Sequence, residues 1–342
     1  MRQILAGSFL TAASFTVGCS QSNAIVTRDY DVRTLTVTLP DFTDAPDLRV
    51  SNRVATTEPT SLFETASCDG DVCHNVSRAA DLLRATKVIL AGVPSTSADE
   101  HDGILRVVAP ADAQRRVQKA VEAALADYAT QMTIGARVTV LPMDLIATLD
   151  HSLREKIDYA TIQDRKPALL TDSQATDLLR ATQSNTQANV TSYPRITLFQ
   201  GQRAYVMTST QKAYVAGYTP STGADGKGKY DPELRIAESG FVLDVRATAS
   251  ADRSSVSLDL RTQLAQVLSM QDRPWTFSSP QQMLKVQVPE QRIQQTDRLI
   301  TLPAGRWALL RVPDTDSAHA DLTKMTFVLL QAQIIDSGLL KH

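Results

Sequence analysis

The stretch NTQANVTSYPRITLFQGQRAYV, residues 185–206, carries the clearest structural pattern in this sequence. After Pro194 it reads as a strand over Arg195–Phe199, a turn at Gln200–Gln202 and a second strand that begins at Arg203. β-Branched and aromatic residues favour strands, and a glycine within a turn accepts backbone angles that other residues resist. We therefore expect strands to dominate the chain from Pro194 onward.

Alternating apolar and polar residues continue downstream. They predict two hairpins, one from 241–248 and 255–261 joined by Ala251–Ser254, and one from 297–302 and 306–312 joined by Pro303–Gly305. Residues 327–335 predict the closing strands. Antiparallel hairpins of this kind have one face against the core and one face in water.

Upstream of this region helices and strands alternate. Residues 104–108 predict a strand, 113–129 an amphipathic helix and 135–141 another strand, which together make a small α+β layer. Weaker patterns predict a strand at 32–39, a helix running into a strand at 77–90, a connector with helical stretches at 142–170 and a helix at 171–182.

These elements predict an α+β fold, with a small N-terminal α+β domain followed by a mainly antiparallel β domain. We divide the chain into a signal peptide at 1–18, an N-terminal strand and Thr/Ser-rich linker at 19–76, a small α+β domain at 77–130 and a β-rich domain at 131–342.

Composition and net charge limit the classes of function to consider. The chain has 342 residues, 43% of them hydrophobic, and a formal net charge of −2. Without a basic block it is a poor candidate for nucleic-acid binding.

The N-terminus predicts export and lipidation. Arg2 precedes a short apolar run over Ile4–Gly18, which is typical of a secretory signal. The run ends at Cys19 in a sequence that resembles a bacterial lipobox, so we expect Cys19 to be lipidated, with a plain secreted protein as the alternative. Ser20 in place of aspartate favours the periplasmic face of the outer membrane. No later apolar stretch is long enough to predict a transmembrane helix.

Two cysteines follow in the linker. Cys68 and Cys73 are candidates for a small disulfide loop in an oxidising compartment. Free thiols and a metal site that includes His74 remain the alternatives.

Motifs of known enzymes are missing. The sequence has no G-x-S-x-G, P-loop, H-E-x-x-H or G-x-G-x-x-G, and Asp150-His151-Ser152 are adjacent, whereas triads converge from distant positions. The glycine-rich run 223–229 predicts a flexible hairpin tip. We predict a protein that is not an enzyme and needs no cofactor.

The order of these motifs resembles the secretin family of type II and type III secretion systems, over about residues 104–336. Residues 104–125 resemble the family's small ring-building domains. The family's characteristic positions in the β domain are matched by Val190, Ser192, Pro194, Thr197, Gly201, Gln202, Gly240, Pro303 and Gly305. Gln200, Ala247 and Arg306-Trp307 depart from the family pattern.

The resemblance implies a homo-oligomeric ring in which each subunit donates strands to a shared β-barrel in the outer membrane. Its partners would be copies of itself, secretion-system proteins and protein cargo. Two functions stay open on the sequence: a channel component for protein secretion, or a non-pore periplasmic ring or scaffold lipoprotein with the same fold.

Overall fold

A computed structural model describes residues 24–37, 39–50, 78–162, 166–186, 189–192, 194–222, 228–275, 284–315 and 321–335. These residues form two compact units. The first unit draws on the segments within 1–37 and 77–124, and the second on those within 38–76 and 125–342. Cys19, Cys68 and Cys73 lie outside the described residues.

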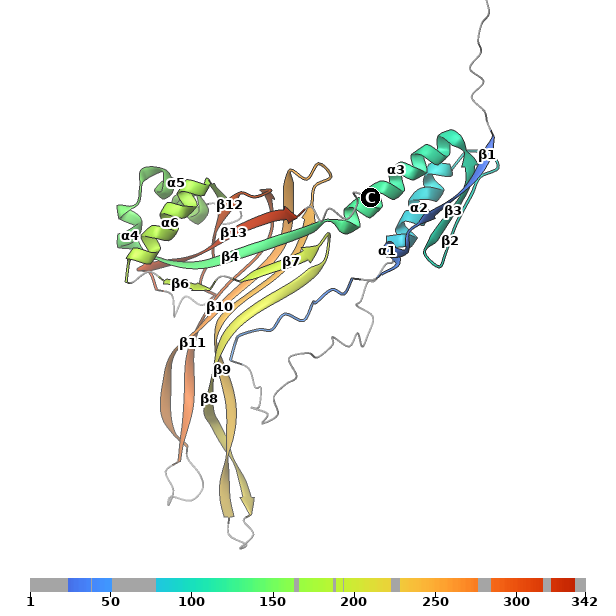
Figure 1. The fold of residues 1–342 in the computed structure, drawn as a ribbon. Helices are drawn as coiled ribbons and strands as arrows, with labels where there is room; N and C mark the ends of the chain where they lie inside the picture. Colours follow the sequence, from blue (N-terminus) through green and yellow to red (C-terminus); the bar gives the residue numbers. More distant parts are fainter. Residues whose placement is uncertain are drawn as a thin grey trace, which may run out of the picture. The chain divides into compact units, whose positions relative to one another are not determined.

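The first unit is a small three-stranded antiparallel sheet with helices. Its elements are β1 (Ile25–Asp31), α1 (Arg33–Thr36), α2 (Arg78–Leu90), β2 (Ser97–His101), β3 (Ile104–Pro110) and α3 (Ala111–Ala129), and the strand order is β1-β3-β2 (Figure 1). The central strand β3 buries every second residue, and α3 contributes Val117 and Val121 to the same buried set. The strand predicted at 104–108 is confirmed, and its alternate residues Leu105 and Val107 form its core face.

One buried amide ties β1 to the rest of this unit. The fully buried side chain of Gln114 on α3 donates to the carbonyls of Val26 and Val107, 2.8 Å from each. Its oxygen accepts from the hydroxyl of Tyr30 at 2.9 Å. A buried polar group is tolerated where its hydrogen bonds are made, so Gln114 links two strands and a helix at low cost.

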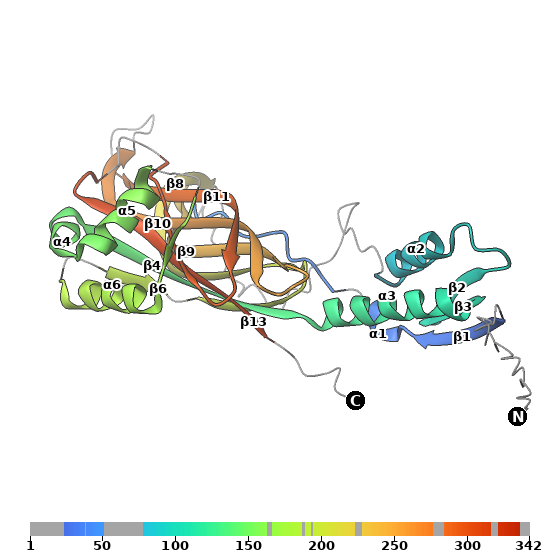
Figure 2. The ribbon, with the colours of Figure 1, turned by 90° about the horizontal axis from the view of Figure 1, so that it is seen from above.

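The second unit contains a six-stranded sheet of β4 (Gln131–Pro142), β5 (Ala168–Leu170), β6 (Asn189–Ser192), β7 (Arg195–Phe199), β12 (Trp307–Arg311) and β13 (Lys324–Ile335). The strand order is β5-β12-β13-β4-β6, with β7 also paired to β4. Helices α4 (Met143–Thr148), α5 (His151–Ile162) and α6 (Asp172–Ser184) group beside this sheet (Figure 2). Thr171 begins α6 with a reciprocal capping box to Gln174.

A four-stranded antiparallel sheet completes the unit. Its strands are β8 (Arg203–Thr222), β9 (Gly228–Ala249), β10 (Ser255–Trp275) and β11 (Leu284–Pro303), in the order β11-β10-β9-β8. They form two consecutive hairpins, β8 with β9 and β10 with β11 (Figure 1). The predicted pairing of 241–248 with 255–261 is confirmed as part of the β9–β10 pair.

The six-stranded sheet is buried on both faces. On β13, Phe327 and Leu329 pack against the helices, whereas Val328 and Leu330 pack against the four-stranded sheet. Burial of one such side chain contributes about 1.5–3 kcal/mol. The near-continuous apolar run of β13 follows from this position between two layers.

The segment 195–206 crosses between the two sheets. β7 pairs with β4, but β8 pairs with β9, so the turn at Gly201 (φ +74°) moves the chain from one sheet to the other. The predicted hairpin of 297–302 with 306–312 is wrong for the same reason. β11 pairs with β10 and β12 with β13, and Gly305 (φ +78°) stands at the crossing. A turn motif by itself does not reveal which partner each flanking strand takes.

Other differences concern local elements. The strand lies at 25–31, and 33–36 is a short helix, so the strand predicted at 32–39 is wrong. Residues 78–90 are helical throughout, and the segment 142–170 contains two helices, α4 and α5. The fold class is confirmed: the chain is α+β, with mainly antiparallel β-structure in its larger part.

Gly240 marks the position where the two hairpins separate. β9 and β10 pair only between Gly240–Ala249 and Val256–Ala265. A Cβ atom on Gly240 would lie 2.2 Å from the carbonyl oxygen of Thr208 and 2.6 Å from the Cα of Ser209. The close approach of β8 to β9 at this level therefore requires glycine.

We predict that Gly240→Ala lowers the free energy of unfolding by about 1–3 kcal/mol, because the new methyl group overpacks a backbone contact. Urea denaturation measures the change. Gly305→Ala is the matched control, because nothing lies within 4 Å of its Cβ position and only the left-handed backbone is penalised, at about 1 kcal/mol. Asparagine should recover stability at 305 but not at 240. A Gly240→Ala protein as stable as the wild type would contradict the crowding.

The turn between β9 and β10 predicts a pH effect. The hydroxyl of Ser250 and then the N–H and hydroxyl of Ser254 hold the pKa of Asp252 at about 2, below its usual 3.8. A depressed carboxyl pKa stabilises the fold above pH 3.8, and this contribution is lost as pH falls toward 2. A carboxyl-carbon NMR titration should place the Asp252 midpoint near 2, and Ser250→Ala should raise it. A midpoint near 3.8 would contradict the turn geometry.

Candidate functional site

The two long hairpins extend beyond the part of the sheet that packs on the core. β8, β9, β10 and β11 contain 20, 22, 21 and 20 residues. Phe241, Leu243, Val245 and Ala247 of β9 belong to the core shared with the six-stranded sheet. Past Gly240 the β9–β10 pairing ends, and each hairpin continues as a separate projecting half (Figure 1).

The projecting half of the first hairpin has one apolar face. Residues directly opposite on paired strands share a face. The register therefore places together Ala213 with Ile236, Val215 with Leu234, Tyr218 with Pro232, and Pro220 with Tyr230. The opposite face carries Lys212, Asp231, Glu233 and Arg235. Leu234 is 44% exposed, so part of this apolar face is in contact with solvent.

The projecting half of the second hairpin has polar and charged residues on the corresponding face. Its face equivalent to the apolar one pairs Met270 with Pro289, Asp272 with Gln287, and Pro274 with Lys285. Asp272 and Lys285 form an exposed ion pair at 3.8 Å. The outer apolar face is therefore confined to β8–β9.

β8 and β11 are the edge strands of this sheet. Prolines stand in both of them, at Pro220, Pro289 and Pro303, where a missing N–H is tolerated because no ladder partner is needed. In the projecting halves side chains join the two edges. The N–H of Val215 donates to the Gln287 side chain at 3.2 Å, and the Tyr218 hydroxyl donates to the Lys285 carbonyl at 3.0 Å.

A segment from near the N-terminus crosses the outer face of the sheet. We call residues 39–50 the strap. Its Leu48 is buried to 1% exposure against Val242 and Ala265. The N–H of Leu48 donates to the Gln263 side chain at 2.8 Å, and the N–H of Val50 donates to the Gln291 side chain at 2.8 Å.

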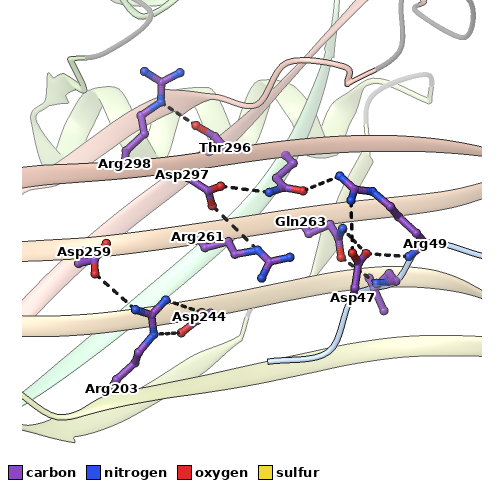
Figure 3. Close-up of polar contacts among 12 residues, drawn as sticks. Asp47, Arg49, Arg203, Asp244, Asp259, Arg261, Gln263, Thr296, Asp297 and Arg298 are labelled. Carbon is purple, nitrogen blue, oxygen red and sulfur yellow. Dashed lines mark hydrogen bonds and ion pairs between the residues drawn. The ribbon is translucent and has the colours of Figure 1, made fainter. Parts of the chain in front are cut away.

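Charged side chains line the same outer face (Figure 3). Arg203 binds both oxygens of Asp244 at 2.9 and 2.8 Å and reaches Asp259 at 3.4 Å. The Asp244 carboxylate raises the pKa of Arg203. Farther along, Arg261 lies 4.0 Å from Asp297, and Gln263 donates to Asp47 of the strap at 2.7 Å. These charges face the strap and the outer surface, away from the core.

The motif positions have structural roles around these sheets. Pro194 is buried, and its carbonyl accepts the N–H of Ala136 at 3.1 Å. The hydroxyls of Thr197 and Thr133 hydrogen bond across β7 and β4 at 2.9 Å. The backbones of Val190 and Ser192 lie on β6, opposite β4.

The turn at 200–202 connects to the rest of the sheet through its two glutamines. The Gln200 side chain accepts the N–H of Ala249 at 2.8 Å and donates to the carbonyl of the same residue at 3.1 Å. The Gln202 side chain accepts the N–H of Phe199 and donates to the carbonyl of Pro40 at 2.9 Å. Gln202 therefore binds the strap.

Gly305 and Pro303 hold the second crossing between sheets. The N–H of Gly305 donates to the carbonyl of Ala332 at 2.7 Å, and the Gln331 side chain donates to the Gly305 carbonyl at 2.8 Å. Pro303 ends β11 opposite Ser255. These contacts attach the end of the four-stranded sheet to β13.

Sequence reasoning missed the strap. Residues 40–50 are polar and proline-containing and have no period of 2 or 3.6, which favoured a loop. The strap's partners lie 162 to 246 residues away in the sequence. The run has apolar residues at Phe42, Ala45, Leu48 and Val50, and nothing in the local sequence distinguishes the buried Leu48 from the others.

Within the described ranges no helix is long and apolar enough to cross a membrane. The described residues also contain no cluster of three or more His, Cys, Asp or Glu side chains suited to a metal ion. The candidate site consists of the edges and the outer face of the four-stranded sheet.

We predict that Arg203→Met destabilises the second unit by about 3 kcal/mol, because it leaves the 2%-exposed Asp244 carboxylate without its ion-pair partner. Denaturant unfolding measures the change. The double variant Arg203→Met/Asp244→Leu should recover most of the loss. Lys285→Met, which breaks the exposed pair with Asp272, is the control and should cost less than about 1 kcal/mol. Equal effects at both pairs would contradict the role of burial.

Comparison with known proteins gives structural matches only. No family model matches the sequence, and no curated protein matches it. The InvG secretin domain β-barrel of the Salmonella injectisome aligns with 76% of this chain and 81% of its own, at 11% identity and a TM-score of 0.30. The Vibrio cholerae type IV competence pilus secretin PilQ aligns with 70% of this chain and 69% of its own, at 11% identity and a TM-score of 0.29.

A third match is the Klebsiella pneumoniae type II secretion system outer membrane complex, which contains PulD. It aligns with 76% of this chain at 13% identity and a TM-score of 0.32. The aligned part spans about half of that chain, 49%.

Proposed function

We propose that this chain is a secretin-like subunit whose copies assemble into a homo-oligomeric ring and form a channel for protein secretion at the outer membrane. The observation that carries the proposal is the open four-stranded sheet of two long hairpins, with β8 at one edge and β11 at the other. The motif glycines 201, 240 and 305 support it, because they stand where the chain enters this sheet, where its two hairpins separate and where the chain leaves it.

Strand direction suits a closed ring. β8 and β11 run in opposite directions, because each neighbour in the sheet is antiparallel. A β11 edge joined to the β8 edge of the next copy would continue the antiparallel pattern. Closing the ring would remove both open edges, which otherwise favour uncontrolled pairing.

Strand length suits a membrane wall. Residues 266–275 of β10 lie past the core and extend roughly 30 Å at about 3.3 Å per residue. The apolar band of a membrane barrel is about 25 Å tall. The apolar face of β8–β9 would meet lipid, and the proposed lipid at Cys19 would anchor the chain to the same membrane. Cargo and secretion-system proteins are the proposed partners.

The alternative is a periplasmic ring or scaffold lipoprotein that does not open a pore. The specific observation in its favour is the polar outer face of the second hairpin, with the Asp272–Lys285 ion pair. A lipid-facing wall would place these charges in hydrocarbon, which is costly.

Particle shape and conductance test the proposal. The membrane-extracted chain should appear in negative stain as rings with a central hole and should pass current in planar bilayers. Rings that pass no current would favour the scaffold. A uniform monomer would contradict both functions.

A matched pair of variants tests the apolar face. Leu234→Arg places a charge on that face and should reduce bilayer insertion, at a cost of about 2–4 kcal/mol if the residue lies at mid-membrane. Thr219→Arg, on the opposite face across from Asp231, should insert normally. Liposome flotation measures insertion, and equal flotation of the two variants would contradict a lipid-facing β8–β9.

Cys19→Ala tests the anchor separately. The variant should move from the membrane fraction to the soluble fraction before rings assemble. Unchanged fractionation would contradict lipidation at Cys19.

A further inference from the structure

We propose that the strap and the short segment 313–315 are edge guards, which confine strand pairing between copies to the projecting halves of the hairpins. The inference rests on the proposed function, because it states where two copies of this chain join. It assigns a role to a segment whose contacts are not needed to complete either sheet.

The strap closes the beginning of the β8 edge. The N–H of Phe42 donates to the Arg203 carbonyl at 2.9 Å, and the N–H of Arg203 donates to Asp41 Oδ1 at 2.7 Å. Arg203 is the first residue of β8, so both backbone groups that it would offer to a neighbouring strand are already used. Asp41 Oδ2 also accepts from Arg246 at 2.7 Å, which fixes the strap across β9.

Residues 313–315 close the β11 edge. The N–H of Gln295 donates to the Pro313 carbonyl at 3.2 Å, and the N–H of Thr315 donates to the Ile293 carbonyl at 2.9 Å. An ion pair anchors this segment: Arg292 binds Asp314 at 2.6 and 2.9 Å, with the two side chains 12% and 17% exposed.

The sheet register places both guards along the core-packed half. Arg203 lies at the same level across the four strands as its paired residues Arg246, Asp259 and Leu299. Ser209 lies level with Gly240, Ala265 and Ile293. A neighbouring β8 that met β11 at these levels would collide with residues 313–315 or bring its own strap against β11.

The projecting halves are different. The outer edges of residues 211–222 of β8 and 284–290 of β11 are joined to each other by the side-chain contacts at Val215 and Lys285, but neither edge has a strand paired to it among the described residues. Side-chain hydrogen bonds exchange more readily than a strand ladder. Copies of the chain can therefore join here without displacing either guard.

Near its end the strap binds the sheet largely through its backbone. Gln291 accepts from the N–H of Val50 and donates to the carbonyl of Leu48 at 2.7 Å, and Gln263 accepts from the N–H of Leu48. Leu48 is its one buried apolar anchor. The strap contacts the outer face, whereas the core lies on the inner face, so its release should leave the sheets folded.

Disulfide trapping between two co-expressed full-length chains tests the proposal. Each chain carries one added cysteine, so a disulfide between them reports a contact between copies. The projecting pair is Val215→Cys with Gln287→Cys, and Ala213→Cys with Gln287→Cys covers a register shift of two residues. The core-level pair is Tyr205→Cys with Asp297→Cys. We expect covalent dimers from a projecting pair and at least tenfold fewer from the core-level pair.

Variants of the strap provide the second part of this test. Asp41→Asn weakens the edge contact, and Leu48→Asp releases the buried anchor; thermal unfolding by circular dichroism checks that both remain folded. Core-level dimers should rise several-fold in both variants, while dimers of the projecting pair stay unchanged. Ser269→Ala, on β10 and away from the strap, is the control.

The outcomes separate the two proposals. Efficient core-level dimers with an intact strap would overturn the guard and leave the ring standing. A monomer with no dimers from any pair would overturn the ring. If the wild-type chain is such a monomer, the strap variants still test the guard. Core-level dimers that form only in the strap variants would support the guard, and no core-level dimers in those variants would overturn it.

Discussion

The antiparallel pairing of β4 with β13 is the constraint on which the second unit depends. The pair runs through Gln131–Pro142 and Lys324–Ile335 without a break in register, and it is buried on both faces. Because period-2 alternation sends neighbouring residues to opposite faces, one strand holds the helices on one side and the long sheet on the other. A one-residue slip would exchange the two sets and leave neither layer properly packed.

This arrangement leaves the hairpins supported at only one end. The core fixes the direction of β9 and β10 up to Gly240 and Ala265, and beyond them each hairpin has its own ladder and a few side-chain hydrogen bonds to the other hairpin. The strap stiffens the supported half from the outer side, with Asp41 and the two glutamines at its ends. The proposed assembly thus combines a rigid base, which each chain completes alone, with projecting strands that gain partners from neighbouring copies.

Local signals predicted local structure well. The alternation at 241–248 and the helices at 113–129 and 171–182 are all explained by neighbours within a few residues, and the structure has a strand or helix at each. The glycines at 201, 240 and 305 belong to motifs that indicated a family, and the structure gives each one a steric or conformational reason.

The predictions that failed concern segments whose partners are distant in the sequence. Pro303–Gly305 looks like a hairpin turn, because nothing nearby says that β12 pairs with β13. The strap looks like a linker, because a strand edge and two glutamine amides more than 150 residues away define its conformation. The sequence therefore predicted the core-packed parts of β9 and β10 and their pairing, but it predicted neither the two long hairpins nor the partly guarded edge.

The distance between the strap and its anchors also sets an order of events. Leu48 and its partner Gln263 are separated by 215 residues, and closing so long a loop is slow and entropically costly. A chain made from its N-terminus exposes the strap first but cannot seat it until β10 and β11 exist. The strap can therefore be seated only after these strands have formed, and until then the β8 edge at Arg203 lacks the two hydrogen bonds that the strap makes with its backbone.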